Sequence, residues 1–295
     1  MTWQGLMIGV FAWLATAGIV TAWQLATRWG VTTTLTPLDL ALLRYGVPGL
    51  ALAPIFWRLG AYAKGQSVWT TVLLVLGGGL PFGLLGMAGA QFAPAAHMGA
   101  LLPGSMPLFV ALLSALVLGE RFSGIRRLGL TLIVGAVFCI TGGTLVEGIG
   151  AHVIFGDALF LIAGVSWAVY TVIFRQSRLD VWHAAAIISG WSTLAVVPLW
   201  LLSPSSGLLA APFHDVMLQI LVQGFLAGLF GMAIFGLAVR RLGPSAAALS
   251  GSVVPALTAL GGWALLGERI TTFTALGIVV MVAGLTAFAI GGNRG

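Results

Sequence analysis

Ten long apolar stretches, separated by short polar breaks, limit this chain more than any other feature of its sequence. Each stretch holds about 20 residues, the length that a helix needs to cross the hydrocarbon core of a bilayer. A membrane barrel would instead need shorter strands of alternating character. The sequence therefore predicts an all-α integral membrane protein with ten transmembrane helices. The stretches are 5–25, 37–57, 68–90, 95–118, 125–145, 154–174, 183–203, 216–238, 244–266 and 272–291.

The composition excludes several other classes of protein. Only 7% of the residues are charged, whereas soluble domains carry about 25%. The net charge of +6 could suggest a nucleic-acid partner, but the cations sit singly or in pairs between apolar stretches. Cys139 is the one cysteine, so neither an internal disulfide nor a cysteine-based metal site can form. The start at Met1 lacks a basic region, so we expect the first apolar stretch to be a retained helix.

The second half of the chain repeats the first. The tetrapeptide Leu-Gly-Glu-Arg at 118–121 recurs at 266–269, an offset of 148 residues. Around it, residues 82–129 align without a gap to residues 230–277. The repeat predicts two five-helix halves, 1–148 and 149–295. Because five is odd, equivalent helices must cross the bilayer in opposite directions, which makes an inverted repeat.

The distribution of cations predicts the orientation in the membrane. Cytoplasmic loops carry an excess of Lys and Arg. With the N-terminus inside, only Arg28 and Arg269 fall in outer loops. We therefore expect an inner-membrane protein with both termini in the cytoplasm. The inside loops and the tail would hold Arg58, Lys64, Arg121, Arg126, Arg127, Arg175, Arg178, Arg240, Arg241 and Arg294.

Short motifs in both halves of the chain are similar to those of a known protein family. Gly156-Asp157, followed by Ser166-Trp167-Ala168 and Tyr170, resembles the opening helix of an EamA-type half. In both halves a proline is followed by Leu-Gly-Glu and then by a glycine, and this order also agrees with the resemblance. The whole chain resembles the EamA-like family of the drug/metabolite transporter superfamily, and within it the YddG-type amino-acid exporters of bacteria. The resemblance implies a basket of helices around a central cavity, with the fifth and tenth helices at the periphery.

Arg44 is the one charge well inside a predicted span. An unpaired charge at that depth costs at least ~2.5–3.5 kcal/mol, so it should face a cavity or a partner. One interpretation is that Arg44, with the adjacent Tyr45, binds a substrate carboxylate or sets the potential of the outer mouth. The other is that Arg44 pairs with Asp39 or caps carbonyl groups near the outer interface.

Aromatic side chains suggest the lining of a cavity. Trp13 and Trp167 occupy equivalent places in the first and sixth helices, and Tyr170 follows one turn later. Trp191 and His97 add polar edges from two further helices. Such residues suit an apolar or aromatic ligand because each joins an apolar ring to a hydrogen-bonding group. The alternatives are packing for the aromatic residues and an interfacial place for His97.

Two prolines and two glutamates recur at equivalent positions. Pro107 and Pro255 fall in mid-helix, where each frees a backbone carbonyl and could form a hinge. A static kink is the alternative. Glu120 and Glu268 in the repeated tetrapeptide lie at helix ends, where they could relay protons. We expect them instead to fix loops, either by capping a helix or by pairing with a nearby Arg.

The sequence as a whole favours transport of a small molecule by alternating access. We found no carboxylate in the interior of a predicted helix, which favours flux that is not coupled to ions. Amino acids are the leading substrate class, with other amphipathic metabolites or drugs as the alternative. A channel would need a selecting ring of polar residues, and an enzyme would need a catalytic constellation. We expect a monomer in the lipid bilayer without cofactor, metal or nucleic acid.

Overall fold

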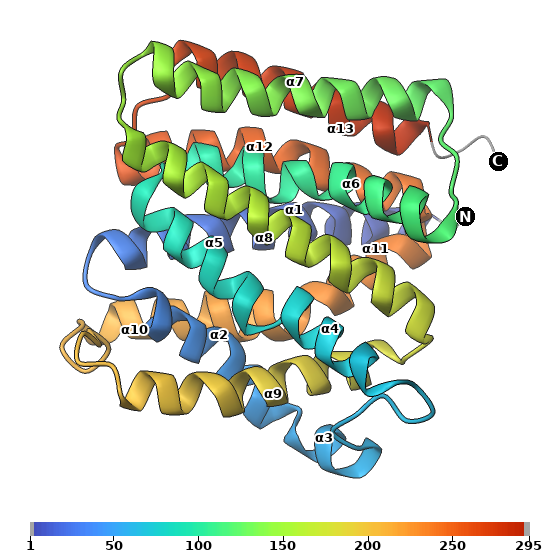
Figure 1. Ribbon diagram of the computed structural model, residues 1–295, viewed down its shortest axis with the longest axis vertical. Helices are drawn as coiled ribbons and strands as arrows, with labels where there is room; N and C mark the ends of the chain where they lie inside the picture. Colours follow the sequence, from blue (N-terminus) through green and yellow to red (C-terminus); the bar gives the residue numbers. More distant parts are fainter. Residues whose placement is uncertain (1–2, 292–295) are drawn as a thin grey trace.

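The computed structural model describes residues 3–291, and all regular secondary structure in these residues is helical (Figure 1). Nine helical spans in this part of the chain are long and apolar enough to cross a membrane, and Pro37–Ala51 with Ala53–Leu59, bent by 59°, forms a tenth candidate. Arg294, counted among the cytoplasmic cations, lies outside the described residues. The elements are α1 (Trp3–Thr32), α2 (Pro37–Ala51), α3 (Ala53–Leu59), α4 (Val68–Gly78), α5 (Leu80–Phe92), α6 (Ala95–Leu118), α7 (Gly124–Val146), α8 (Ala151–Ser177), α9 (Val181–Leu201), α10 (Phe213–Gln219), the π-helix η1 (Ile220–Phe230), α11 (Gly231–Leu242), α12 (Pro244–Leu266) and α13 (Thr272–Ile290).

Each predicted stretch overlaps one of these spans, but three of the spans are irregular. Stretch 37–57 bends after Leu52, where Pro54 opens α3. Stretch 68–90 is broken at Gly79, between α4 and α5. Stretch 216–238 passes from α10 through the π-helix η1 into α11. The apolar pattern therefore predicts where the chain crosses, while the irregular turns depend on local chemistry.

The helices α7 and α13 pack against each other along one edge of the molecule (Figure 1). Gly129 and Gly277 of the sequence repeat make this contact possible. A Cβ on Gly129 would lie 2.6 Å from the backbone nitrogen of Phe288, and one on Gly277 would meet the side chain of Ile140. Small residues at a helix interface allow such close approach in membranes. This edge is the peripheral place that the family resemblance implies for the fifth and tenth helices.

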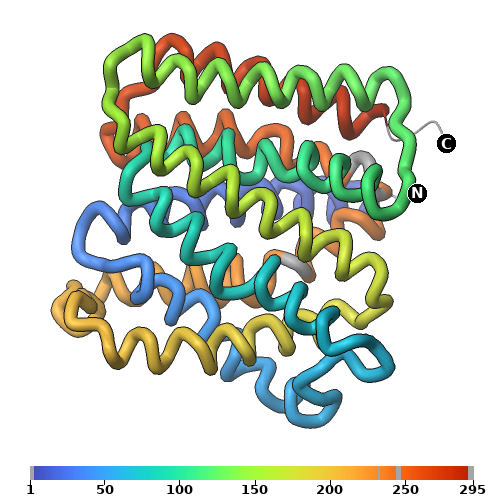
Figure 2. Tube along the Cα trace, viewed as in Figure 1, coloured from blue at the N-terminus to red at the C-terminus, as the bar shows by residue number. Residues whose placement is uncertain are grey.

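The helices α6 and α12, which carry the repeated tetrapeptide at their ends, run in opposite directions. In Figures 1 and 2, α6 and α12 lie together in the middle of the molecule, and each runs from the end at which the other finishes. The helix α1 begins at the end where α13 finishes. Two copies of one sequence pattern are thus presented to opposite ends of the bundle.

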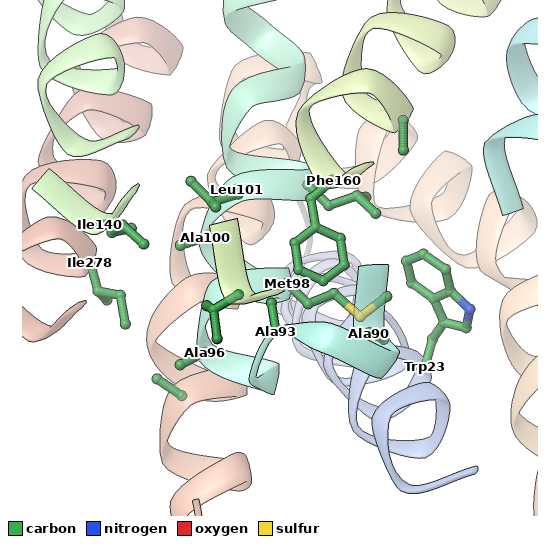
Figure 3. Packing of buried hydrophobic residues seen from close by; sticks show 14 of the residues in the cluster. Trp23, Ala90, Ala93, Ala96, Met98, Ala100, Leu101, Ile140, Phe160 and Ile278 are labelled. Carbon is green, nitrogen blue, oxygen red and sulfur yellow. The ribbon is translucent and has the colours of Figure 1, made fainter. Parts of the chain in front are cut away.

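The main core lies where α1, α5, α6 and α8 meet. Met98 and Phe160 are fully buried there, and Figure 3 shows them surrounded by short side chains such as Ala90, Ala93 and Ala96. The outer surface is the opposite of that of a soluble protein: large apolar side chains such as Leu116 are exposed. Because the bundle exposes apolar groups all round, lipid rather than water suits its surface.

Candidate functional site

A cavity of about 70 Å³ opens between helices of both halves. Four of the seven predicted site residues line it together: Arg44, Tyr45, Trp167 and Tyr170. The volume admits a few water molecules or a small polar group, and is below the roughly 300–1,000 Å³ of sites that enclose a drug-sized ligand. The other lining residues are Gly78, Ala185, Ile188, Ser189, Ala227 and Gly228.

Arg44 reaches this cavity from α2, and among the described residues it has no counter-ion. Its Cζ lies 4.9 Å from the ring centroid of Trp23, a cation–π contact. Its Nε and Nη1 are buried and have no hydrogen-bond partner within the described residues. A stacked ring compensates only part of the cost of removing a guanidinium from water. The site therefore contains donors that an anion could satisfy.

The alternative partner, Asp39, is already bound elsewhere. Its Oδ1 accepts hydrogen bonds from Ser206 Oγ at 2.6 Å and from Trp200 Nε1 at 2.7 Å. Its Oδ2 caps the start of α2 through the backbone nitrogen of Thr36. No ion pair joins it to Arg44 in the part of the chain that the structure describes. Asp39 thus fixes the loop after α9 to the start of α2.

A row of aromatic rings begins in the lining of the cavity, with Trp167 and Tyr170. The rings of Trp167 and Tyr170 are 4.9 Å apart, and Trp167 lies 4.9 Å from Phe82. Phe82 in turn stacks at 6.4 Å on Trp23, the ring that carries Arg44. Rings at these distances pack favourably and leave flat apolar faces for a ligand. The row therefore connects the two lining rings, through Phe82, to the ring that stacks on Arg44.

Irregular backbone of both halves borders the same cavity. Gly78 lies at the break between α4 and α5, and Ala227 and Gly228 lie in η1. The offset of 148 residues places Gly79 over Ala227, so the two irregular segments are equivalent in the repeat. Discontinuous helices in both halves are typical of binding sites in transporters, and π-helical turns are frequent at functional sites.

These segments were not predicted, although the sequence contains a signal for them. Three successive glycines, 77–79, precede Pro81, and Gly224 and Gly228 are spaced for close helix contact. Symmetric interruptions of the helices were instead predicted at Pro107 and Pro255. Both α6 and α12 run through these prolines without interruption, and the hinge role of the two residues stays a prediction.

The remaining candidates lie outside the residues that line this cavity. Trp191 donates from Nε1 to the carbonyl of Ala61 at 2.9 Å and packs against Phe56. Trp13 is half-buried on α1. The structure does not bring these two tryptophans to Arg44, and their part in binding stays a prediction.

His97 is part of a buried polar contact between α6, α8 and α13. Its Nδ1 lies 2.8 Å from Asp157 Oδ1, and its Nε2 lies 3.0 Å from Thr274 Oγ1. The expectation that no carboxylate lies inside a span is wrong for Asp157. The helix α8 begins three residues earlier than predicted, at Ala151, so Asp157 falls in its second turn and is fully buried. Flux without ion coupling stays a prediction, but the absence of a carboxylate inside a span no longer supports it.

The sequence profile of the EamA-like transporter family matches residues 7–142 and again residues 154–290. The chain belongs to the EamA-like transporter family. It is 28% identical over 259 residues to an uncharacterized transporter of Archaeoglobus fulgidus, covering 85% of this chain and 87% of the relative. It is 26% identical over 257 residues to the uncharacterized transporter YyaM of Bacillus subtilis, covering 84% and 83%.

A solved crystal structure shares the fold of this EamA-like chain. It covers 97% of this chain and 98% of its own, with a TM-score of 0.59 and 19% sequence identity. Membership of the family and the apolar spans together make this a multi-pass membrane transporter. The double match of the profile also fits the repeat that places two irregular segments at one cavity.

Proposed function

We propose that this transporter carries amino acids or closely related carboxylate-bearing metabolites across the bacterial-type inner membrane. Access would alternate between two inverted halves, 1–148 and 149–295, with both termini in the cytoplasm. The observation that carries the proposal is Arg44, a cation at membrane depth whose buried Nε and Nη1 have no hydrogen-bond partner among the described residues.

The chemistry of Arg44 favours a carboxylate. A guanidinium stays protonated and presents its donors in a planar fork that matches a carboxylate in two parallel hydrogen bonds. Since Asp39 is bound elsewhere, an acid supplied by the cargo would neutralise this charge. The rings of Trp167 and Tyr170 would then contact the apolar part of the cargo. Such a site suits an amino acid with an apolar or aromatic side chain.

The paired irregular segments support alternating access. Each half contributes one of them to the cavity, so a rocking movement of one half against the other would change the cavity from both sides. Flux driven by the gradient of the cargo would need no further titratable group. The alternative is an exporter of other amphipathic metabolites or drugs, for which the row of aromatic rings would matter more than Arg44.

Flux into proteoliposomes tests the proposal. A panel of amino acids should be carried, while the corresponding amides and decarboxylated amines, which lack the carboxylate, should be carried far less. Arg44→Lys should retain part of the flux and Arg44→Ala should lose most of it. The matched control is Arg126→Ala. Arg126 also lies over a ring, 4.5 Å from the centroid of Phe288, and its buried Nε has no partner among the described residues, but it does not line the cavity.

The outcomes separate the two candidate substrates. Equal transport of an amino acid and its amide, unchanged by Arg44→Ala, would refute carboxylate recognition and favour amphipathic cargo. Equal loss of flux in the Arg44 and Arg126 variants would show that the charge matters for folding alone. A melting temperature measured for each variant distinguishes a folded, inactive protein from an unfolded one.

A further inference from the structure

Each glutamate of the repeated tetrapeptide binds an arginine of the opposite half. Glu268 Oε1 accepts from Arg28 Nε at 2.7 Å, and Glu120 Oε1 accepts from Arg175 Nη2 at 2.7 Å. Arg28 and Arg175 lie in the C-terminal parts of α1 and α8, the first helices of the two halves. The glutamates follow α12 and α6, the fourth helices. The contact is therefore reciprocal: the first helix of each half is joined to the fourth helix of the other.

The tetrapeptide forms the same local structure in both copies. Gly119 and Gly267 end their helices with φ of 67° and 68°, a left-handed conformation that glycine adopts without strain. The following backbone nitrogens, of Glu120 and Glu268, return to carbonyls of the last helical turn. The sharp turn brings each glutamate beside its helix end, within reach of the other half.

The two pairs lie at opposite ends of the molecule. The helix α1 ends where α6 and α13 begin, and α8 ends where α6 finishes and α7 begins (Figure 1). By the predicted orientation, the Arg28–Glu268 pair faces outward and the Arg175–Glu120 pair faces the cytoplasm. We call them the outer pair and the inner pair.

The outer pair is held more firmly than the inner pair. Its side chains are 18% and 15% exposed, against 51% and 33% for the inner pair. Arg28 also donates to the carbonyl of Ala90 at 2.6 Å, and Glu268 accepts from the backbone nitrogen of Ala95 at 2.8 Å. The outer pair thus joins α1, the turn between α5 and α6, and the end of α12. Ion pairs shielded from water are harder to break than exposed ones.

We infer that the outer and inner pairs are the gating contacts of the transport cycle, each joining the two halves at one mouth while that mouth is closed. The inference rests on the proposed alternating access, in which one mouth opens as the other closes. A contact between the halves at a mouth must break when the halves separate there. Since both pairs are intact at 2.7 Å, this structure corresponds to a state with both mouths closed, the outer mouth by the better-shielded pair.

The contacts of the two glutamates do more than fix a loop within one half of the chain. Each glutamate has an arginine next to it in sequence, Arg121 or Arg269, yet binds an arginine of the other half. The helix start capped by Glu268 is that of α6, also in the other half. The expected helix cap and the expected pairing with arginine are both present. In each case the partner of the glutamate lies in the other half of the chain.

Accessibility of a single cysteine tests the inference without any substrate. The parent would be Cys139→Ser with Ser189→Cys, which places one thiol in the cavity. Vesicles of defined orientation would receive a membrane-impermeant thiol reagent on one side. Glu268→Gln should raise the rate of labelling from the outside several-fold and lower it from the inside. Glu120→Gln should do the reverse, with a smaller change because the inner pair is more exposed.

Three controls keep the test decisive. Arg121→Gln removes the neighbouring charge that binds neither glutamate in the described pairs and should leave labelling unchanged. Arg175→Glu should act like Glu120→Gln, and adding Glu120→Arg should restore the parent rates by reversing the pair. If Glu268→Gln fails to fold, Arg28→Lys, which keeps the charge but loses the fork, should still raise labelling from outside.

Unchanged labelling in both glutamine variants, or a change in the same direction in both, would overturn the inference. The readout is independent of the cargo. Opposite shifts in labelling with no amino-acid flux would sustain the gating contacts and refute the proposed substrate. Amino-acid flux that depends on Arg44, together with unchanged labelling, would do the opposite.

Discussion

The third spans of the two halves occupy equivalent places in the repeat but are built differently. In the first half, the span is broken at Gly79 between α4 and α5. In the second half, the equivalent residues continue through η1, a π-helix of 11 residues. Both border the cavity. The comparison teaches that the repeat has kept the position of an irregular turn and not its geometry.

The broken span and the π-helix satisfy the hydrogen bonds of their backbone groups in different ways. At the break, Tyr45 Oη donates to the carbonyl of Gly79 at 2.6 Å, and the nitrogen of Leu80 donates to Ser192 Oγ at 2.9 Å. Side chains of other helices thus replace the missing helical bonds, as membrane depth requires. A π-helix instead keeps its backbone bonds within the segment, in wider turns. The stability of the broken span should therefore depend on side chains of neighbouring helices more than the stability of the π-helix does.

The largest effect should come from a methyl group added beside the break. In Gly77→Ala the new Cβ would lie 2.6 Å from the nitrogen of Tyr170 and 2.7 Å from the carbonyl oxygen of Ser166. Because both atoms are backbone, α8 itself would have to move, which should cost about 3 kcal/mol of stability. Thermal unfolding of the purified protein measures the loss. Gly236→Ala is the control, since a Cβ there meets open space; equal melting temperatures for the two variants would contradict the prediction.

A smaller loss should follow from removing the hydroxyl that serves the break. Tyr45→Phe keeps the ring but leaves the carbonyl of Gly79 without this donor, at a cost of about 2 kcal/mol. The same substitution at Tyr62, which is exposed, provides the control. If Tyr45→Phe and Tyr62→Phe unfold at the same temperature, the carbonyl must find water or another donor, and the break is less dependent on its neighbours than we infer.

The smallest effect is expected on the π-helix. Gln223 donates from Nε2 to Thr27 Oγ1 at 2.9 Å, while its Oε1 is buried without a partner among the described residues. Its Nε2 also donates to Gln219 Oε1 at 3.3 Å. Gln223→Leu removes both hydrogen bonds together with one unsatisfied acceptor, so stability should fall by only about 1 kcal/mol. Chemical denaturation with circular dichroism would detect the change. A loss as large as that of Tyr45→Phe would show that η1 also relies on its neighbours.

The spans could be predicted from the sequence because their cause is local: an apolar stretch of sufficient length crosses a membrane whatever surrounds it. Arg44 was predictable for a similar reason, since a single charge in such a stretch needs an explanation. The π-helix was not, because its bonding pattern leaves no periodic signal in a uniformly apolar segment. The buried contact of His97 with Asp157 was missed because a predicted start at residue 154 placed Asp157 in the first turn, at a helix end, whereas α8 begins at Ala151.

The uncompensated guanidinium of Arg44 also has an electrical consequence. Without an anion the cavity carries a positive charge at membrane depth, and a bound carboxylate would cancel it. Moving one elementary charge across the whole membrane changes its energy by about 2.3 kcal/mol per 100 mV. A voltage should therefore bias the access states of the empty transporter, and should act far less on the transporter loaded with an anion. If the proposed cycle is correct, a voltage step should produce a transient current in the empty protein, and the cargo should suppress that current.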